Sequence, residues 1–308
     1  MPAFLAVDWG TSNLRAWVVQ ADGSVGAHEE LPLGVSRLQP GEAQRRFEDE
    51  VRPALHAEGL PALMAGMIGS TLGWVEAPYL DCPADAAALG RALVEVAPGV
   101  RIAPGLRCIR PDGAPDVMRG EETQIIGWLA QGAERRRGVR IVCHPGTHAK
   151  WVRVEDGRVT GFVTMMTGEL FDTLSKHSVL KSEDGPTPDP AADDAAFDLG
   201  VDAAGEGDAL SARLFTARSR VVGGDMPKAA ARSYLSGLLI GADVASGPRM
   251  LGADPAPGGP PLALVGDAAL CGLYARALAR RGMASETFSG EDAVLSGLRA
   301  LFDQGEPR

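Results

Sequence analysis

A short bend of small and polar residues separates two apolar runs at the front of the chain, FLAVDW and LRAWVVQ. A tight bend of this kind exposes backbone N–H groups and hydroxyls, which are ligands for phosphate. The candidate phosphate ligands are Gly10, Thr11, Ser12 and Asn13. The Asp8 carboxylate, near the end of the first run, is a candidate ligand for Mg²⁺, directly or through water.

The bend is not a Walker-type phosphate loop. That loop runs from a strand into a helix and carries a second glycine and a lysine, and none of these features follows Gly10. The run over residues 14–20 instead alternates and reaches Ala21-Asp22-Gly23, a hairpin-type turn, before another run over residues 24–31. The order is therefore strand, bend, strand, turn, strand.

The same hairpin occurs a second time near the middle of the chain. Residues 141–159 match residues 5–25 in a Gly-Thr pair, a tryptophan and an Asp-Gly turn followed by valine. Turn residues are common enough for a chance match, but their shared order favours a duplication. Gly146 and Thr147 would then bind phosphate from a second side, while His144 stands where the first copy has Asp8.

The elements around the two hairpins alternate between strands and helices, which predicts an α/β architecture with a mixed sheet. We expect helices over residues 41–55, 84–97, 121–138, 228–244, 267–282 and 291–303, and strands over 62–69, 101–109 and 261–266. The helix over 121–138 is the natural domain joint, which gives domains of 1–138 and 139–308. The acidic stretch over 181–208 is interpreted as a surface loop or a mobile flap.

Composition limits the partners of the chain. The net charge of −10 over 308 residues provides no basic surface for nucleic acid. The four cysteines are scattered without metal-ligand spacing and are interpreted as reduced core residues. We expect no signal peptide and no membrane span, and therefore a cytoplasmic protein.

Five motifs together resemble the 2-dehydro-3-deoxygalactonokinase family, within the actin-like sugar kinase and Hsp70 superfamily. They are DWGTSNLRAW (8–17), GMIGSTLGWVEAPY (66–79), DVMRGEETQ (116–124), PGTHAKWV (145–152) and MTGELF (166–171). The resemblance implies two ribonuclease H-like domains with an interdomain cleft. It also implies Mg²⁺-dependent transfer of the ATP γ-phosphoryl group to the terminal C6 hydroxyl of 2-keto-3-deoxygalactonate, in galactonate catabolism.

The resemblance also implies a catalytic base and an adenosine site. Related sugar kinases carry the base as an Asp that opens a helix, and Glu121 occupies that place here, with Glu122 as the second candidate. Both could instead be ordinary acids at a helix start. Gly266 and Asp267 match the turn that holds adenosine, although many superfamily members have two glycines there.

An acid sugar requires cations, and the motifs contain Arg15, Arg119, His148 and Lys150. Arg119, beside the base, is the candidate clamp for the substrate carboxylate, whereas Arg15 could serve phosphate. Each of these charges could also be solvated surface. The remaining substrate candidates are Ser70 and Glu76 for sugar hydroxyls, Trp74 as a pocket wall or a core residue, and Glu169 as a substrate ligand or a helix cap.

Two alternatives stay open at this point. A kinase of the same fold could act on another small sugar or keto-deoxy acid. A nucleotide-dependent ATPase switch could use the same two hairpins to drive a partner protein. The motifs around residues 66–79 and 119–124 favour a metabolic kinase, because a switch needs no sugar-binding residues. A homo-oligomer is possible.

Overall fold

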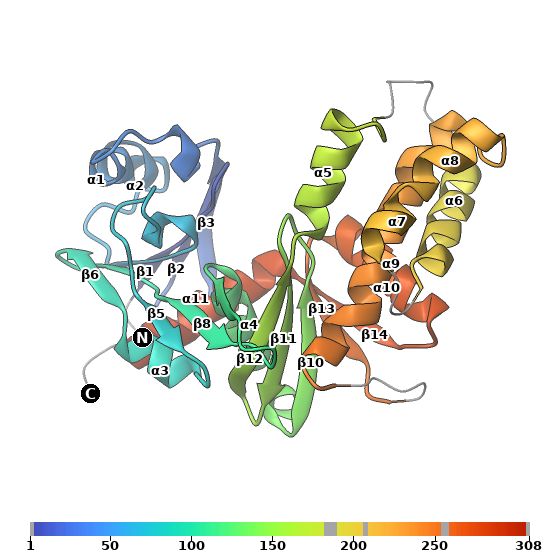
Figure 1. Ribbon diagram of the computed structural model, residues 1–308. Helices are drawn as coiled ribbons and strands as arrows, with labels where there is room; N and C mark the ends of the chain where they lie inside the picture. Colours follow the sequence, from blue (N-terminus) through green and yellow to red (C-terminus); the bar gives the residue numbers. More distant parts are fainter. Residues whose placement is uncertain (1–2, 182–189, 206–208, 254–258, 306–308) are drawn as a thin grey trace. The chain divides into compact units, whose positions relative to one another are not determined.

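The structure is a computed structural model that describes residues 3–181, 190–205, 209–253 and 259–305. The chain divides into two compact units (Figure 1). The first unit comprises residues 1–139, 154–161 and 289–308, and the second comprises 140–153 and 162–288. The first segment of the first unit ends at residue 139, one residue from the predicted domain boundary at 138. Residues 154–161 and 289–308 were predicted to lie in the second domain, but they group with the first unit.

The first unit is built on a six-stranded mixed sheet in the order β3-β2-β1-β4-β7-β6. Its strands are β1 (Phe4–Trp9), β2 (Leu14–Val19), β3 (Val25–Leu31), β4 (Ala62–Ala65), β6 (Val94–Ala97) and β7 (Val100–Ile102). β1 pairs antiparallel with β2 and parallel with β4. A separate three-stranded sheet joins β5 (Tyr79–Asp81), β8 (Gly105–Ile109) and β9 (Pro115–Met118).

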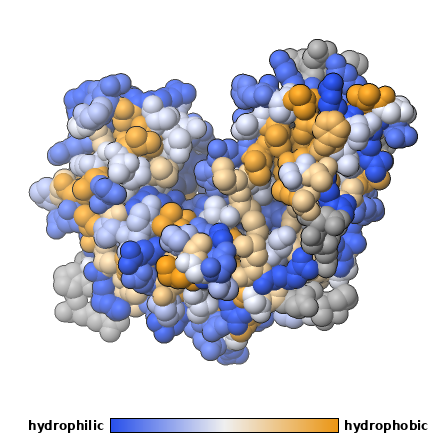
Figure 2. Space-filling model, in the orientation of Figure 1, coloured by the Kyte–Doolittle hydropathy of each residue, from blue (hydrophilic) through white to orange (hydrophobic). Residues whose placement is uncertain are grey.

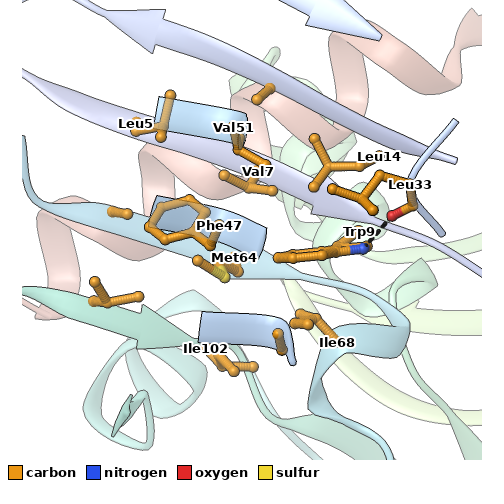
Figure 3. Packing of buried hydrophobic residues seen from close by; sticks show 14 of the residues in the cluster. Leu5, Val7, Trp9, Leu14, Leu33, Phe47, Val51, Met64, Ile68 and Ile102 are labelled. Atoms are coloured by element: carbon orange, nitrogen blue, oxygen red, sulfur yellow. Dashed lines mark hydrogen bonds between the residues drawn. The ribbon is translucent and has the colours of Figure 1, made fainter. Parts of the chain in front are cut away.

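Helical segments cover both faces of the six-stranded sheet. On one face lies the continuous segment α1 (Ala43–Arg46), η2 (Phe47–Val51) and α2 (Arg52–Ala54). Figure 3 shows how Phe47 and Val51 from this segment pack on Val7 and Met64 of the sheet. The helices α3 (Ala86–Arg91), α4 (Glu121–Ala130) and α11 (Gly290–Gly305) complete the unit, and Phe302 of α11 stacks on Phe4 at 4.0 Å between ring centroids.

Two glycines explain why the C-terminal helix belongs to the first unit. A Cβ on Gly127 of α4 would lie 1.7 Å from the Ala293 carbonyl oxygen, and one on Gly297 of α11 would lie 1.9 Å from the Thr123 carbonyl oxygen. The two helices therefore approach each other so closely that no side chain fits at either crossing point. Residues 291–303 were correctly predicted as a helix, but their packing partner is far away in the sequence.

The second unit repeats the strand order of the first. Its five-stranded sheet has the order β12-β11-β10-β13-β14. The part β12-β11-β10-β13 corresponds to β3-β2-β1-β4 of the first unit, because in both the next strand along the chain returns beside the strand that begins the hairpin. The strands are β10 (Val139–His144), β11 (Ala149–Glu155), β12 (Arg158–Met165), β13 (Leu262–Gly266) and β14 (Ser285–Ser289). Residues 154–161, the turn between β11 and β12 with the adjoining ends of both strands, group with the first unit. This shared order confirms the predicted duplication and the α/β class with mixed sheets.

A helical layer packs beside the second sheet. Its helices are α5 (Thr167–His177), α6 (Pro190–Ala203), α7 (Leu210–Leu214), α8 (Thr216–Gly223), α9 (Ala231–Met250) and α10 (Ala268–Arg280). Figure 2 shows apolar side chains gathered over these helices on the face drawn there. Large apolar residues exposed in this layer include Phe215 and Val222.

Several sequence predictions about elements were wrong. The strand predicted over 101–109 is two strands of different sheets, β7 and β8. The strand predicted over 62–69 ends at Ala65, and the helix predicted over 121–138 ends at Ala130. The helix predicted over 84–97 ends at Arg91, and Val94–Ala97 form β6, because alternating β-branched residues fit a pleated sheet. The loop predicted over 181–208 contains the helix α6, which packs against α9. Residues 182–189 and 206–208 lie outside the described part. All four cysteines are free thiols, as expected; three of them are buried, but Cys82, also expected in the core, is half-buried.

Candidate active site

The bend at the front of the chain is a turn between β1 and β2, here called the first turn (residues 10–13). The Gly10 N–H donates to the Asn13 carbonyl at 2.9 Å. The Gly10, Thr11 and Ser12 carbonyls accept from backbone N–H groups of residues 34–36 at 3.0–3.1 Å. Within the described residues, no hydrogen bond engages the backbone N–H of Thr11 or Ser12, and both residues are exposed. The turn thus points its carbonyls inward and leaves donors on its surface.

Gly34 holds this turn in place, and the sequence analysis did not single it out. A Cβ at Gly34 would lie 2.1 Å from the Thr11 carbonyl oxygen and 2.3 Å from the Ser12 carbonyl carbon. Beside it, the Trp9 indole N–H donates to the Leu33 carbonyl at 2.5 Å, as Figure 3 shows. The only sequence signal was a glycine in LPLGV, and nothing local distinguishes it from other loop glycines.

Asp8 lies at the base of the first turn, near two charged candidates. Asp8 is paired with Arg15 across β1 and β2. Burial raises the Asp8 pKa to about 6, the Arg15 charge lowers it, and the Glu121 charge raises it further. Glu121 is therefore close enough to Asp8 to act on it electrostatically.

Gly66 brings the start of α4 to the end of β1. Gly66 follows β4, and a Cβ on it would lie 3.3 Å from Asp8 Oδ1. A Cβ on Gly120 would in turn lie 3.3 Å from the Gly66 Cα. Gly66 and Gly120 have φ angles of 92° and 106°, a region that favours glycine. The carboxyl ends of β1 and β4 and the start of α4 therefore meet at one edge of the sheet.

The two glutamates that open α4 have different environments. Glu122 is fully buried, and its carboxyl accepts from the Gly120 N–H at 2.7 Å and from the Thr123 hydroxyl at 3.0 Å. Burial, together with the Glu121 charge, raises the Glu122 pKa to about 8. Glu121 is half-buried and accepts from the Arg119 N–H at 3.1 Å. Glu122 thus supports the local fold, whereas Glu121 lies at the edge shared with Asp8.

The Arg119 side chain is buried beneath the segment 66–79. Its Nη2 donates to the Ala77 carbonyl at 2.7 Å, and its guanidinium lies 4.3 Å from the centroid of the Tyr79 ring. Its Nε and Nη1 are buried and have no hydrogen-bond partner among the described residues. Arg119 therefore carries two unsatisfied donors.

The segment 66–79 places the remaining candidates of the first unit. The Ser70 hydroxyl donates to the Met67 carbonyl at 2.7 Å, which closes the turn internally. Trp74 is half-buried and packs on Phe47, with ring centroids 6.0 Å apart. Glu76 is exposed. Trp74 thus contributes to the core of the first unit.

The second hairpin forms a turn between β10 and β11, here called the second turn (residues 145–148). A Cβ on Gly168, in the first turn of α5, would lie 2.6 Å from the Gly146 carbonyl oxygen. The Glu169 N–H donates to the Thr147 carbonyl at 3.0 Å. The start of α5 thus packs directly on the second turn.

Two side chains of the second turn region pair with neighbours. The Glu169 carboxylate lies 2.5 Å from Nε2 of His148, and both side chains are about half exposed. The N-cap residue of α5, Met166, makes no side-chain cap hydrogen bond. Lys150 is buried, and its Nζ donates to the His148 carbonyl at 3.2 Å.

The third candidate segment of the second unit lies beside the second turn. β13 runs parallel to β10, so their carboxyl ends are adjacent. A Cβ on Gly266 would lie 3.5 Å from the Pro145 carbonyl oxygen. Asp267 caps α10, because its carboxylate accepts from the Leu270 N–H at 2.9 Å. The structure therefore brings Gly146, Thr147, Gly266 and Asp267 to one edge of the second sheet.

Comparison with known proteins identifies the family. The model of the 2-keto-3-deoxy-galactonokinase family matches residues 8–301. The chain belongs to this family.

Two relatives of the 2-keto-3-deoxy-galactonokinase family extend over nearly the whole chain. The 2-dehydro-3-deoxygalactonokinase of Escherichia coli K12 is 36% identical over 298 residues, covering 97% of this chain and 97% of that protein. A Rhizobium meliloti protein named as a probable 2-dehydro-3-deoxygalactonokinase is 38% identical over 302 residues, covering 96% of this chain and 95% of its own. The resemblance seen in the sequence, and with it the prediction of a kinase, is confirmed.

Solved structures support the fold. A crystal structure of a Sinorhizobium meliloti protein assigned the same kinase name has a TM-score of 0.84 and 38% identity, covering 97% of each chain. Component A of (R)-2-hydroxyglutaryl-CoA dehydratase from Acidaminococcus fermentans has a TM-score of 0.51 at 14% identity, covering 99% of this chain and 100% of its own, a likeness of fold alone. The predicted class, two ribonuclease H-like domains of the actin-like type, is confirmed.

The described residues contain neither a metal-ligand cluster nor a membrane-spanning helix. No cluster of three or more His, Cys, Asp or Glu side chains there is arranged to hold a metal ion. No helix in the same part of the chain combines the length and apolarity of a membrane span.

Proposed function

We propose that this chain transfers the γ-phosphoryl group of ATP to the terminal C6 hydroxyl of 2-dehydro-3-deoxy-D-galactonate, giving the 6-phosphate and ADP in galactonate catabolism. The observation that carries the proposal is the position of Glu121 beside Asp8 and the first turn, because phosphoryl transfer requires a proton acceptor next to the phosphate site. The two compact units would be the two domains that hold the substrates.

The two turns would bind the phosphate chain. The first turn offers the N–H groups and hydroxyls of Thr11 and Ser12, supported from behind by Gly34. The second turn offers Gly146 and Thr147 on top of the start of α5. Adenosine would lie toward Gly266 and Asp267, although the Asp267 carboxylate already caps α10. Asn13 donates to Glu30 at 2.9 Å and so would act mainly through its backbone.

The residues around Asp8 fit a magnesium ion. Mg²⁺ in kinases is usually held by one or two carboxylates together with substrate phosphates. Asp8 is such a carboxylate; burial raises its pKa to about 6, Arg15 lowers it and Glu121 raises it, so a bound cation would favour its charged form. Bound there, Mg²⁺ would neutralise charge on the phosphates.

Glu121 would act as the base. The acceptor oxygen forms a bond to the γ-phosphorus, the bond from that phosphorus to the ADP oxygen breaks, and the hydroxyl proton passes to the Glu121 carboxylate. Glu122 is less suited to this task, because its carboxyl is fully buried and bonded to Gly120 and Thr123. The contrast in burial supports Glu121 over Glu122.

Arg119 would bind the carboxylate of the sugar acid. An unsatisfied buried N–H costs free energy, and Arg119 has two such groups, Nε and Nη1, each of which could donate to a carboxylate oxygen. Because both atoms are buried, the segment around Ser70 and Trp74 must shift as the substrate enters. Glu76, exposed on that segment, and His148, Lys150, Glu169 and Arg15 are the further substrate candidates.

ADP release with different acceptors tests the proposal. ATP and Mg²⁺ are supplied with 2-keto-3-deoxygalactonate, its gluconate epimer, galactonate or no acceptor. We expect ADP only with a keto-deoxy acid and fastest with the galactonate-derived one. ADP release at the same rate with every acceptor and with none would refute the proposal and favour an ATPase switch. Acceptor-dependent ADP release with a different acid would show that the protein is a kinase with another substrate specificity.

Three further predictions stay predictions. The net charge of −10 leads us to expect no binding to nucleic acid. A cytoplasmic location is expected from the metabolic role. Self-association into a homo-oligomer is a possibility that sedimentation analysis would decide.

A further inference from the structure

A buried carboxylate in the second unit joins three elements that are far apart in the sequence. Asp243 lies on α9 and is 4% exposed. Its Oδ1 accepts from the Trp151 indole N–H, and its Oδ2 accepts from the Thr167 hydroxyl at 2.6 Å and from the Tyr274 hydroxyl at 2.5 Å. Here this group is called the Asp243 cluster (Trp151, Thr167, Asp243 and Tyr274).

Each donor of the Asp243 cluster belongs to an element that carries part of the candidate nucleotide site. Trp151 lies on β11, which leaves the second turn. Thr167 opens α5, and the next two residues contact Gly146 and Thr147. Tyr274 lies on α10, which begins at the Gly266-Asp267 turn. One carboxylate therefore fixes the second turn, the start of α5 and the Gly266-Asp267 turn relative to one another.

Burial of the Asp243 carboxylate costs free energy, which suggests that the residue has a role beyond stability. A buried carboxylate loses several kcal/mol of hydration, and apolar residues of similar volume often replace such groups without loss of stability. The packing leaves little freedom, because a Cβ on Gly247 would lie 2.4 Å from the Trp151 ring. A cavity of about 270 Å³ adjoins the cluster, and Asp243 is the one ionisable side chain among the described residues that line it.

We propose that Asp243 is a positioning residue for nucleotide binding, which sets the geometry of the second turn through Trp151, Thr167 and Tyr274. The inference rests on the proposed function, since it takes the second turn as a phosphate ligand. Asp243 does not touch the nucleotide in this account. Its loss would weaken nucleotide binding, and it would leave the sugar-acid residues of the first unit unchanged.

A pair of tyrosine variants tests the proposal without disturbing the cluster greatly. Tyr274→Phe removes one donor to Asp243. Tyr234→Phe is the matched control, because Tyr234 is also fully buried and its hydroxyl also bonds, at 2.7 Å, but to Thr216. We expect Tyr274→Phe to raise the Kd for Mg·ADP about fivefold and the KM for ATP similarly, and to change the KM for the sugar acid by less. We expect Tyr234→Phe to change each value less than about twofold.

Substitutions of Asp243 itself separate positioning from charge. Asp243→Asn keeps an oxygen for Trp151, and its amide can donate to the two hydroxyls, so we expect it to retain near-normal Mg·ADP binding. Asp243→Leu removes every acceptor, and we expect a loss of binding of more than about tenfold. Calorimetric titration with Mg·ADP measures both without any acceptor substrate.

The outcomes distinguish this inference from the proposed function. Equal effects of Tyr274→Phe and Tyr234→Phe, or wild-type binding in a folded Asp243→Leu variant, would overturn the positioning role. If the unaltered protein bound no Mg·ADP, the proposed function itself would fail. If it bound Mg·ADP tightly and Tyr274→Phe raised only the KM for the sugar acid, the assignment of the second turn to the nucleotide would be wrong.

Discussion

The buried carboxyl of Glu122 should make the stability of the first unit depend on pH, and Glu122→Gln should remove that dependence. The Glu122 pKa is about 8 in the folded protein, against an ordinary value of 4.5. Between these values the unfolded chain has lost the proton while the folded chain keeps it. The folded state therefore binds more protons, and the free energy of unfolding falls as pH rises through this window.

The magnitude follows from the size of the window. Each pH unit between the two pKa values corresponds to about 1.4 kcal/mol, so the wild-type protein should lose about 4 kcal/mol between pH 5 and pH 8 through Glu122. A glutamine at this position can accept from the Gly120 N–H and donate to the Thr123 hydroxyl, so the local structure is preserved. Between pH 5 and pH 8, the free energy of unfolding of Glu122→Gln should therefore rise by about 4 kcal/mol relative to that of the wild type.

Urea unfolding at pH 5, 6, 7 and 8, followed by circular dichroism, measures this difference. Glu291→Gln is a matched control, since Glu291 is likewise an acid in the first turn of a helix of the first unit but is exposed. We expect the free energy of unfolding of Glu122→Gln to exceed that of the wild type by an amount that grows steadily from pH 5 to pH 8. For Glu291→Gln we expect the difference from the wild type to stay constant over this range. A difference for Glu122→Gln that stays constant from pH 5 to pH 8 would refute the reasoning.

Three further predictions concern the first turn, the helix crossing and the substrate. Gly34→Ala should raise the KM for ATP by more than about tenfold in steady-state assays. The new Cβ atom would lie 2.1 Å from the Thr11 carbonyl oxygen and would displace the first turn. An unchanged KM for ATP would contradict this prediction. Gly127→Val should lower the free energy of unfolding by about 3 kcal/mol, because α4 and α11 cannot separate to admit the side chain without loss of packing. Urea unfolding measures this change, and a wild-type value would contradict the prediction. Arg119→Met should raise the KM for the sugar acid about 100-fold and leave the KM for ATP unchanged, and equal effects on both would contradict the carboxylate assignment.

Local chemistry made the turns and several helices predictable from the sequence. Gly-Thr and Asp-Gly pairs between alternating runs specify hairpins, and the repeated order of these residues revealed the duplication. The helix start at Glu121 was predicted because two acids follow a glycine before an apolar pattern. The role of Glu121 as the base came from the family resemblance, and its proximity to Asp8 was not predicted.

Contacts between distant segments were not predictable. Gly34 looks like any loop glycine until Thr11 lies against it, and Asp243 looks like one polar residue in a helix until Trp151, Thr167 and Tyr274 donate to it. The helix α6 was missed because alternating alanines and aspartates next to prolines resemble a solvated loop. Its packing on α9 overrides that local pattern.

The most direct test of the central claim compares Glu121→Gln with Glu122→Gln in one assay of acceptor-dependent ADP formation, with calorimetric binding of Mg·ADP as the control. We expect Glu121→Gln to lower kcat by about 100- to 10,000-fold while Mg·ADP still binds, and Glu122→Gln to stay within about tenfold of the wild type. Near-normal turnover in Glu121→Gln together with a collapse in Glu122→Gln would contradict the account, because the buried carboxyl would then be the base.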